Sequence, residues 1–87
     1  MVNYDIYVFT TRHILAKESP ILRVIHDEDG DWQFLNATDS LVVGDARIVS
    51  LGEIISLDNT LSEEICLPKG KQADRDFVGG AWSILDV

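Results

Sequence analysis

Short apolar, β-branched runs alternate with polar turns along this chain. The stretch YDIYVFTT, residues 4–11, is rich in aromatic and β-branched residues and predicts a first strand. A loop is expected at 17–20. Two further β-type runs, PILRVIH and WQFLNA, then lie on either side of HDEDGDW, residues 26–32. These two runs predict a β-hairpin whose turn is the acidic stretch.

The expected register of this hairpin follows from its turn. Asp-Gly at 29–30 is a favoured two-residue turn, because glycine accepts a positive φ and aspartate tolerates one. Such a turn sets Ile25 opposite Phe34, so that both lie on one face. It also sets Glu28 opposite Asp31, a repulsive pair that indicates a wider loop or a cationic neighbour.

A helix is indicated by the sequence SLGE, residues 50–53. These residues form a capping box, in which the Ser50 hydroxyl accepts from the Glu53 amide and the Glu53 carboxylate reaches back to the Ser50 amide. The apolar stripe that follows at helical spacing consists of Leu51, Ile54 and Ile55.

A second short helix is predicted directly after the first. TLSE, residues 60–63, repeats the capping pattern, and Leu61 and Ile65 form an i,i+4 pair. Pro68 limits this helix because it disfavours the helical conformation of the preceding residue. The two helices are expected to join at residues 58–59.

The final run, DFVGGAWSILDV, predicts a closing strand that bends at Gly79-Gly80. Strands, then helices, then a strand indicate an α+β fold over one domain, residues 1–87. We expect a small antiparallel sheet with a short two-helix segment packed on one face. The residues expected to pack together beneath the first helix are Ile25, Trp32 and Phe34, and Trp82 is expected to lie near the same core.

Length and charge narrow the classes of function. A chain of 87 residues has little room for a deep substrate pocket, which disfavours an enzyme. The net charge of −8 repels nucleic acid phosphates and anionic lipid headgroups. We therefore expect no nucleic acid and no membrane as partners, and a basic protein as the favoured one.

The cysteine content and the beginning of the chain indicate the compartment. Cys66 is the only cysteine, which excludes an intrachain disulfide and a thiolate metal cluster. The chain begins MVNYD, without a basic start or an apolar signal segment, and its longest apolar run, residues 6–9, is far shorter than the roughly 20 residues of a membrane span. A cytoplasmic location is expected.

The acidic stretch has three interpretations: a metal site, a catalytic site and a turn. An EF-hand alignment with Gly30 at its sixth position puts Ile25 first and Asn36 twelfth, and neither is a strong calcium ligand. Carboxylates at a hairpin tip are solvated, which disfavours acid–base catalysis. The prediction is a turn with a secondary role as an acidic contact surface. The residues of this surface are Asp27, Glu28, Asp29 and Asp31.

Other reactive residues are few. His26 is expected to be a hydrogen-bonded structural residue and Cys66 a small buried one, so no catalytic, metal-binding or cofactor-binding residue is predicted. The one basic stretch, LPKGKQADR, predicts a solvated loop, with anion binding or a clamp on the acidic tip as alternatives. Its cations are Lys69, Lys71 and Arg75.

The order of three motifs resembles a known family. DGDWQFL, then VSLGEIISLDNTL, then LPKG with an arginine shortly after, is similar to a family of short bacterial domains of unknown function. One branch of that family is assigned to immunity proteins of polymorphic toxin systems. The similarity covers residues 24–75, and Asn59 departs from it because the family pattern has proline there. The resemblance supplies no catalytic residue.

These observations predict a non-enzymatic protein-binding domain. The resemblance implies a narrower function, an immunity protein that neutralises a toxin by binding it directly. The alternative is a small structural or accessory domain that self-associates through an exposed sheet edge. An unrecognised hydrolase is the third hypothesis.

Overall fold

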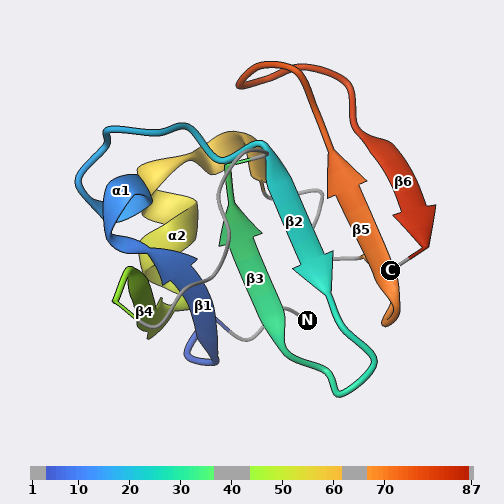
Figure 1. The fold of residues 1–87 in the computed structure, drawn as a ribbon, viewed down its shortest axis with the longest axis horizontal. Helices are drawn as coiled ribbons and strands as arrows, with labels where there is room; N and C mark the ends of the chain where they lie inside the picture. The colour runs from blue at the N-terminus through green and yellow to red at the C-terminus, as the bar shows by residue number, and fades with distance from the viewer. Residues whose placement is uncertain (1–3, 37–43, 62–66, 87) are drawn as a thin grey trace.

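The computed structural model describes residues 4–36, 44–61 and 67–86. Within these ranges, six strands form one mixed sheet in the order β4-β1-β3-β2-β5-β6 (Figure 1). The strands are β1 (Tyr7–Thr11), β2 (Arg23–His26), β3 (Trp32–Leu35), β4 (Ala46–Ser50), β5 (Lys71–Asp74) and β6 (Ser83–Asp86). The helices are α1 (Arg12–Leu15), α2 (Leu51–Leu57) and the 3₁₀ turn η1 (Asn59–Leu61). The α+β class is thus confirmed.

The sheet is larger than the predicted small antiparallel sheet and is partly parallel. β1 runs parallel to β3, with Phe9 beside Gln33, whereas the other neighbouring strands are antiparallel. The β2–β3 hairpin places β3 between β2 and β1, so strands that are not consecutive become neighbours. Such pairing leaves no local signal in the sequence, which is why the prediction was wrong here.

Three elements were not predicted. α1 begins after Thr11, whose hydroxyl accepts a long hydrogen bond from the Ile14 amide at 3.4 Å. β4 forms at residues 46–50, for which no strand was predicted, and β5 forms at residues 71–74, within the stretch predicted as a solvated loop. Both strands pair along their full length with a neighbour, because the sheet supplies partners for their backbone groups.

The register of the β2–β3 hairpin differs by one residue from the prediction. Val24 lies opposite Phe34, and the loop spans five residues, 27–31, instead of a two-residue turn. A shift of one residue exchanges the faces of a strand. Val24 therefore joins Phe34 in the core, and the predicted packing of Ile25 beside Phe34 is wrong, since Ile25 lies on the opposite face.

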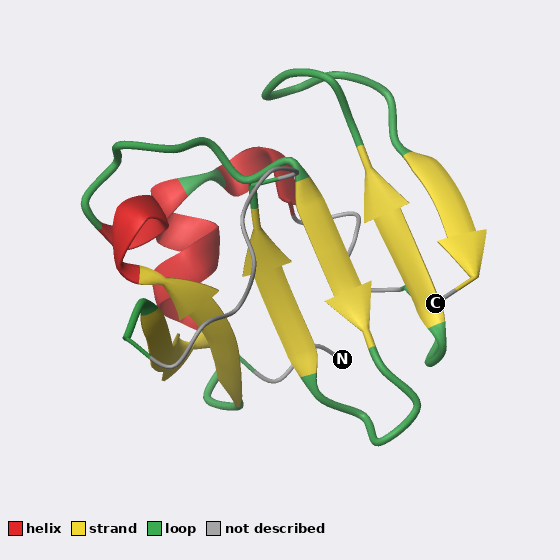
Figure 2. Cartoon of the chain, viewed as in Figure 1, coloured by secondary structure: helices red, strands yellow, loops and turns green. Residues whose placement is uncertain are grey.

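Helix α2 covers the core face as predicted. The Ser50 hydroxyl accepts from the Glu53 amide at 3.2 Å, and Leu51 and Ile54 are buried. The expected position of Trp82 near this core is also confirmed. The buried cluster comprises Val8, Ile14, Ile21, Val24, Trp32, Phe34, Leu51, Ile54, Leu61, Leu67 and Ala73. Figure 2 shows the helices gathered on the side of β1 and β3, with β5 and β6 on the opposite side.

The second predicted helix is described only as η1. Asp58 caps η1, because its carboxylate Oδ1 accepts from the Thr60 amide at 3.0 Å. The remainder of the predicted capping box, at residues 62–63, and the residues Ile65 and Cys66 lie outside the described part of the chain.

A buried arginine connects several of these segments. The side chain of Arg75 has no exposed surface. Its Nε and Nη2 donate to the Ile21 carbonyl at 3.1 and 2.9 Å, Nη1 donates to the Thr60 hydroxyl at 2.8 Å, and Nη2 also donates to Asp58 Oδ2 at 2.6 Å. The guanidinium lies 4.4 Å from the ring centre of Trp82. The prediction of a solvated side chain was wrong for Arg75.

The partner carboxylate of Arg75 is held in its charged form. Burial would raise the pKa of Asp58, but hydrogen bonds from Thr60 and from Arg75, together with the guanidinium charge, outweigh burial and lower that pKa below its ordinary value. The charged pair is thus part of the folded state.

Replacing Phe34 by alanine tests the core. The ring is fully buried, so Phe34→Ala is expected to cost about 3–5 kcal/mol of unfolding free energy. Ile25→Ala is the control, and it should cost clearly less because Ile25 is partly exposed on the other face. Urea denaturation measures both, and equal losses would contradict the register described here.

Acid should weaken the Asp58–Arg75 pair. The pKa of Asp58 is lower in the folded chain than in the unfolded chain. The contribution of Asp58 to the free energy of unfolding is therefore complete above its unfolded pKa of about 3.9, and it disappears as the pH falls through its folded pKa. Asp58→Asn should cost about 3–5 kcal/mol at pH 7, since it leaves a buried guanidinium uncompensated. Urea titrations between pH 7 and pH 3 should show a smaller acid-induced loss for the variant than for the wild type.

Candidate protein-binding site

The acidic loop, residues 27–31, is organised by its first residue. Asp27 Oδ1 accepts from the amides of Asp29 and Asp31, both at 3.0 Å. The Asp27 amide donates to the Asp31 carbonyl, and the Gly30 amide donates to the Asp27 carbonyl, each at 3.0 Å. Gly30 has a φ of +94°, which a residue with a side chain rarely adopts. Asp27 is therefore a structural residue of the loop, which its sequence position did not reveal.

The other three carboxylates of the predicted contact surface do not organise the loop but face solvent. Glu28, Asp29 and Asp31 are all exposed at the tip of the hairpin. Together with Asp27, they outnumber the two neighbouring cations, Lys69 and Lys71, so the field at this end of the sheet is negative. This field extends into solvent, where a charged partner can meet it.

The turn before β5 packs against the acidic loop. A Cβ at Gly30 would lie 3.5 Å from Lys69 Cε, and a Cβ at Gly70 would lie 3.1 Å from Glu28 Oε1. The Gly70 amide donates to the His26 carbonyl at 2.7 Å. Lys69 thus lies against the loop. The predicted repulsive pair indicated a wider loop or a cationic neighbour, and the structure has both.

His26 has the structural role expected from the sequence. Its Nδ1 lies 2.7 Å from the Leu67 carbonyl oxygen, which can only accept, so Nδ1 carries the proton and donates it. The imidazole stacks on Trp32 with ring centres 3.9 Å apart and an interplanar angle of 12°. These contacts hold the base of the acidic loop against the segment that leads into β5.

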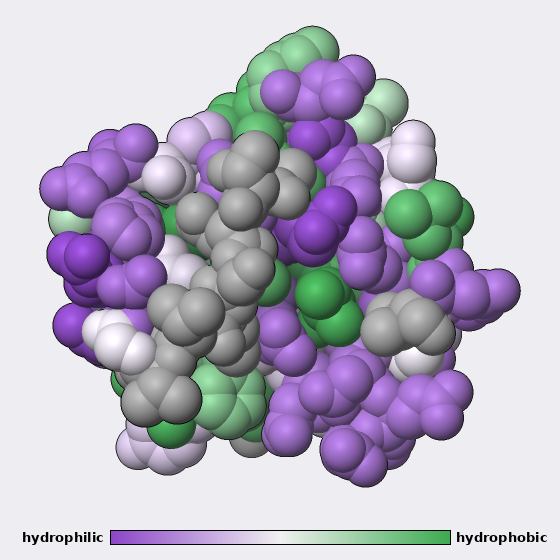
Figure 3. Space-filling model, in the orientation of Figure 1, coloured by the Kyte–Doolittle hydropathy of each residue, from purple (hydrophilic) through white to green (hydrophobic). Residues whose placement is uncertain are grey.

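The terminal hairpin, residues 71–86, exposes apolar side chains. Phe77 is 66% exposed and Ile84 is 58% exposed, with Val78 and Leu85 both at 49%. In Figure 3, hydrophobic residues stand out where Figure 1 draws β6 and the loop that precedes it, on a face that is otherwise largely hydrophilic. The sequence signal for this surface is the pair of adjacent apolar residues in β6, Ile84 and Leu85, which were not predicted to form an exposed surface.

The acidic loop and the end of β6 lie at the same end of the sheet. His26, directly before the loop, pairs with Lys71 of β5, and Lys71 pairs with Asp86 of β6. Neighbouring strands are about 4.8 Å apart, so Asp86 stands about 10 Å across the sheet from His26. Lys71 also forms an ion pair with Asp86. We call the acidic loop together with Asp86 the acidic end.

A second charged cluster joins α1 to the start of β4. Arg12 Nε donates to Asp45 Oδ1 at 2.6 Å, and His13 lies between Asp45 Oδ2, at 3.6 Å, and Glu18 Oε1, at 3.3 Å. The hydrogen bond from Arg12 holds the pKa of Asp45 below its ordinary value. These contacts fix the orientation of α1, which the sequence did not predict.

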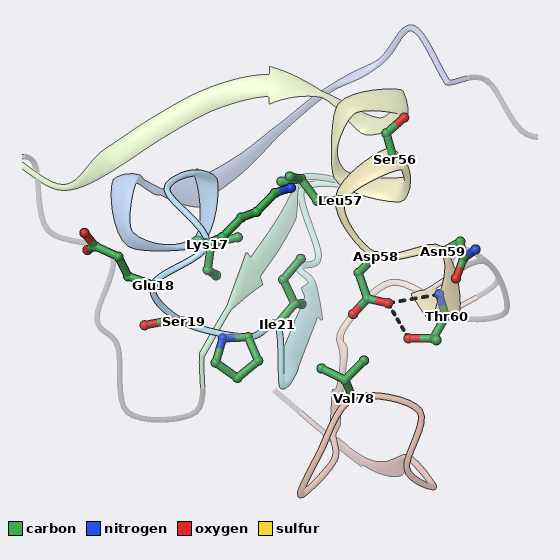
Figure 4. A pocket seen from close by; sticks show the side chains of 12 residues that line it. Lys17, Glu18, Ser19, Ile21, Ser56, Leu57, Asp58, Asn59, Thr60 and Val78 are labelled. Carbon is green, nitrogen blue, oxygen red and sulfur yellow. Dashed lines mark hydrogen bonds between the residues drawn. The ribbon is translucent and has the colours of Figure 1, made fainter.

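An open pocket of about 560 Å³ lies between the α1–β2 loop and the end of α2 (Figure 4). Asp58 and Thr60 line it, joined by the hydrogen bonds drawn in that figure. Lys17, on the opposite wall, has a φ of +62°. This conformation ends α1, because the amide of residue 17 donates a hydrogen bond to the carbonyl of residue 14 and the amide of residue 18 donates one to the carbonyl of residue 13. The backbone of Lys17 is thus explained by helix capping.

The described residues include no group of three or more His, Cys, Asp or Glu side chains placed to hold a metal ion. In the same part of the chain, no helix has the length and apolar character needed to cross a membrane.

No family model matches the chain, and no match was found among curated proteins or solved structures. The resemblance to short bacterial domains stays a prediction.

The two kinds of carboxylate in the acidic loop should respond differently to substitution. Asp27→Ala removes an acceptor of two amide hydrogen bonds and should cost about 1–2 kcal/mol. Asp27→Asn keeps a side-chain oxygen and should cost less, while Asp29→Asn, at an exposed turn position, should leave stability unchanged. Thermal melts of the three variants provide the comparison, and an unaltered melting temperature for Asp27→Ala would contradict the role of Asp27.

Proposed function

We propose that this chain is a non-enzymatic protein-binding domain whose partner presents basic residues to the acidic end. The observation that carries this proposal is the group of exposed carboxylates at that end. Glu28, Asp29 and Asp31 are exposed in the loop, and the Asp86 side chain is 82% exposed. Carboxylates placed in this way attract a cationic surface at little cost in desolvation before contact.

The charge of the whole chain supports the same class of partner. With a net charge of −8, the domain repels polyanions and accelerates encounter with a basic protein, most strongly at low ionic strength. The exposed apolar residues of the terminal hairpin, next to the acidic end, would supply contact area after encounter. Charge then governs the rate of association, and apolar contact governs the lifetime of the complex.

One narrower hypothesis belongs to this proposal, and one alternative competes with it. An immunity protein that neutralises a toxin by direct binding is one case of it, supported by the motif resemblance. Self-association is the second candidate, favoured by β4 and β6, which form the two edges of the described sheet. Sedimentation over a range of protein concentrations distinguishes these, because self-association alone requires a concentration-dependent mass.

Neutralising the acidic loop tests the proposal. A partner captured from the source cell at physiological salt is purified, and its association with the chain is measured by surface plasmon resonance. Glu28→Gln combined with Asp31→Asn should slow association about tenfold at low salt and flatten its salt dependence, with a much smaller effect on dissociation. Asp27 is retained in this variant because it organises the loop.

The matched control removes the same charge elsewhere. Glu53→Gln combined with Asp76→Asn changes two exposed carboxylates outside the acidic end, in α2 and after β5. This control should reduce the association rate much less. Equal effects of the two variants would show that net charge alone matters, and failure to capture any protein partner would count against the proposal.

A further inference from the structure

We propose that the free edge of β6 binds an extended segment of the partner, which adds antiparallel to β6 as one further strand and places a basic residue opposite Asp86. This inference rests on the proposed function and names the binding mode and the chemistry of the partner.

β6 presents an unpaired strand edge. Among the described residues, β6 pairs with β5 on one side and with no strand on the other, and all four of its residues are exposed. Its outer backbone donors and acceptors are therefore available to a strand from another chain. An added antiparallel strand would continue the pattern of β3, β2, β5 and β6, which are antiparallel to their neighbours in turn.

The residues at the centre of β6 favour such pairing. Natural edge strands are usually protected by lysine, proline or a bulge, but β6 reads SILD, with Ile84 and Leu85 at its centre. The other edge strand, β4, reads ARIVS and carries Arg47 beside Ile48. The edge of β6 therefore lacks the central charge that β4 has.

Ile84 and Leu85 extend the sheet on opposite faces. Ile84 pairs with Ala73, which is buried in the core, and Leu85 pairs with Gln72 on the other face. A strand next to β6 would place one of its side chains beside each of them. Since cross-strand pairs of β-branched or aromatic residues are favourable, the segment should carry two consecutive residues of these types.

The acidic end defines the direction of the segment. In an antiparallel arrangement, the residue opposite Asp86 precedes the two residues opposite Leu85 and Ile84. A lysine or arginine there would share the exposed Asp86 carboxylate with Lys71 and lie within the field of the acidic loop. The predicted recognition segment is therefore one or two basic residues followed by two β-branched or aromatic residues.

A second copy of this chain fits the edge less well. Each copy carries a net charge of −8, and β6 itself contains no cation, so two antiparallel β6 strands would give neither Asp86 a basic partner while the net charges of the two copies repel each other. Charge complementarity thus selects a basic segment of a different protein over self-pairing.

Short synthetic peptides test this mode without the natural partner. The probe is a capped peptide, Lys-Lys-Val-Val-Thr-Thr, titrated into ¹⁵N-labelled protein at low salt. Saturable amide shifts are expected in β6 and in the acidic loop. The same peptide with glutamates in place of lysines should bind at least tenfold more weakly, and N-methylation at alternate residues should weaken binding by a similar factor, because it blocks strand pairing.

Two substitutions provide a matched pair. Ile84→Thr keeps a β-branched residue but removes apolar contact, and should weaken peptide binding about fivefold. Ile48→Thr makes the same change at a similarly exposed position on the other edge strand and should have no effect. Equal binding of the two charge forms, insensitivity to N-methylation, or shifts confined to other strands would overturn the inference.

The remaining outcomes separate the two proposals. Amide shifts in β6 that change with protein concentration in the absence of peptide would show pairing between copies and overturn the inference. If the captured partner responds to neutralisation of the acidic loop but not to Ile84→Thr, the edge-binding mode is wrong while the proposed function stands. If the peptide binds β6 as expected but association of the partner does not change when the acidic loop is neutralised, the proposed function is wrong while the edge-binding mode stands.

Discussion

The buried guanidinium of Arg75 is the interaction on which much of this structure depends. A buried charge is tolerated only when its donors find acceptors, and here the acceptors come from two separate segments. One is the Ile21 carbonyl before β2, and the other is the stretch after α2 that supplies the Asp58 carboxylate and the Thr60 hydroxyl. Trp82 covers the guanidinium from the side of β6. One side chain immediately after β5 therefore fixes the helical segment and the terminal hairpin relative to the same point of the sheet.

A second constraint acts on the other end of β5. Asp27 shapes the acidic loop, His26 bonds to the Leu67 carbonyl, and the Gly70 amide bonds to the His26 carbonyl. β5 is thus held at its start by the hairpin base and at its end by Arg75. This explains why a segment as polar as KQAD becomes a strand: its place between β2 and β6 is determined by contacts at both ends.

The local elements of the fold could be predicted from the sequence, whereas its long-range pairing could not. Local patterns identify the cap at Ser50, the first strand, the two hairpin strands and the closing strand. The cap is present as predicted, and the strands are shorter than the predicted runs. The parallel pairing of β1 with β3 and the burial of Arg75 depend on partners distant in the chain. The hairpin register was missed because an Asp-Gly pair favours a two-residue turn, while the Asp27 carboxylate stabilises a longer loop. For the candidate site, the acidic residues were identified, but the apolar edge beside them was not.

An exposed apolar edge is a hazard for a small protein, and the distribution of charge in this chain reduces it. Pairing between two copies at β6 would give neither Asp86 a cationic partner, and an overall charge of −8 on each copy adds repulsion at longer range. The same charges attract a basic segment, so a single arrangement of carboxylates discourages self-pairing and favours a foreign strand. Lysine at the edge would protect it equally well against self-pairing, but would also repel the basic partner. The acidic loop next to the unprotected strand β6 therefore favours partners with a positive charge over a second copy of this acidic chain.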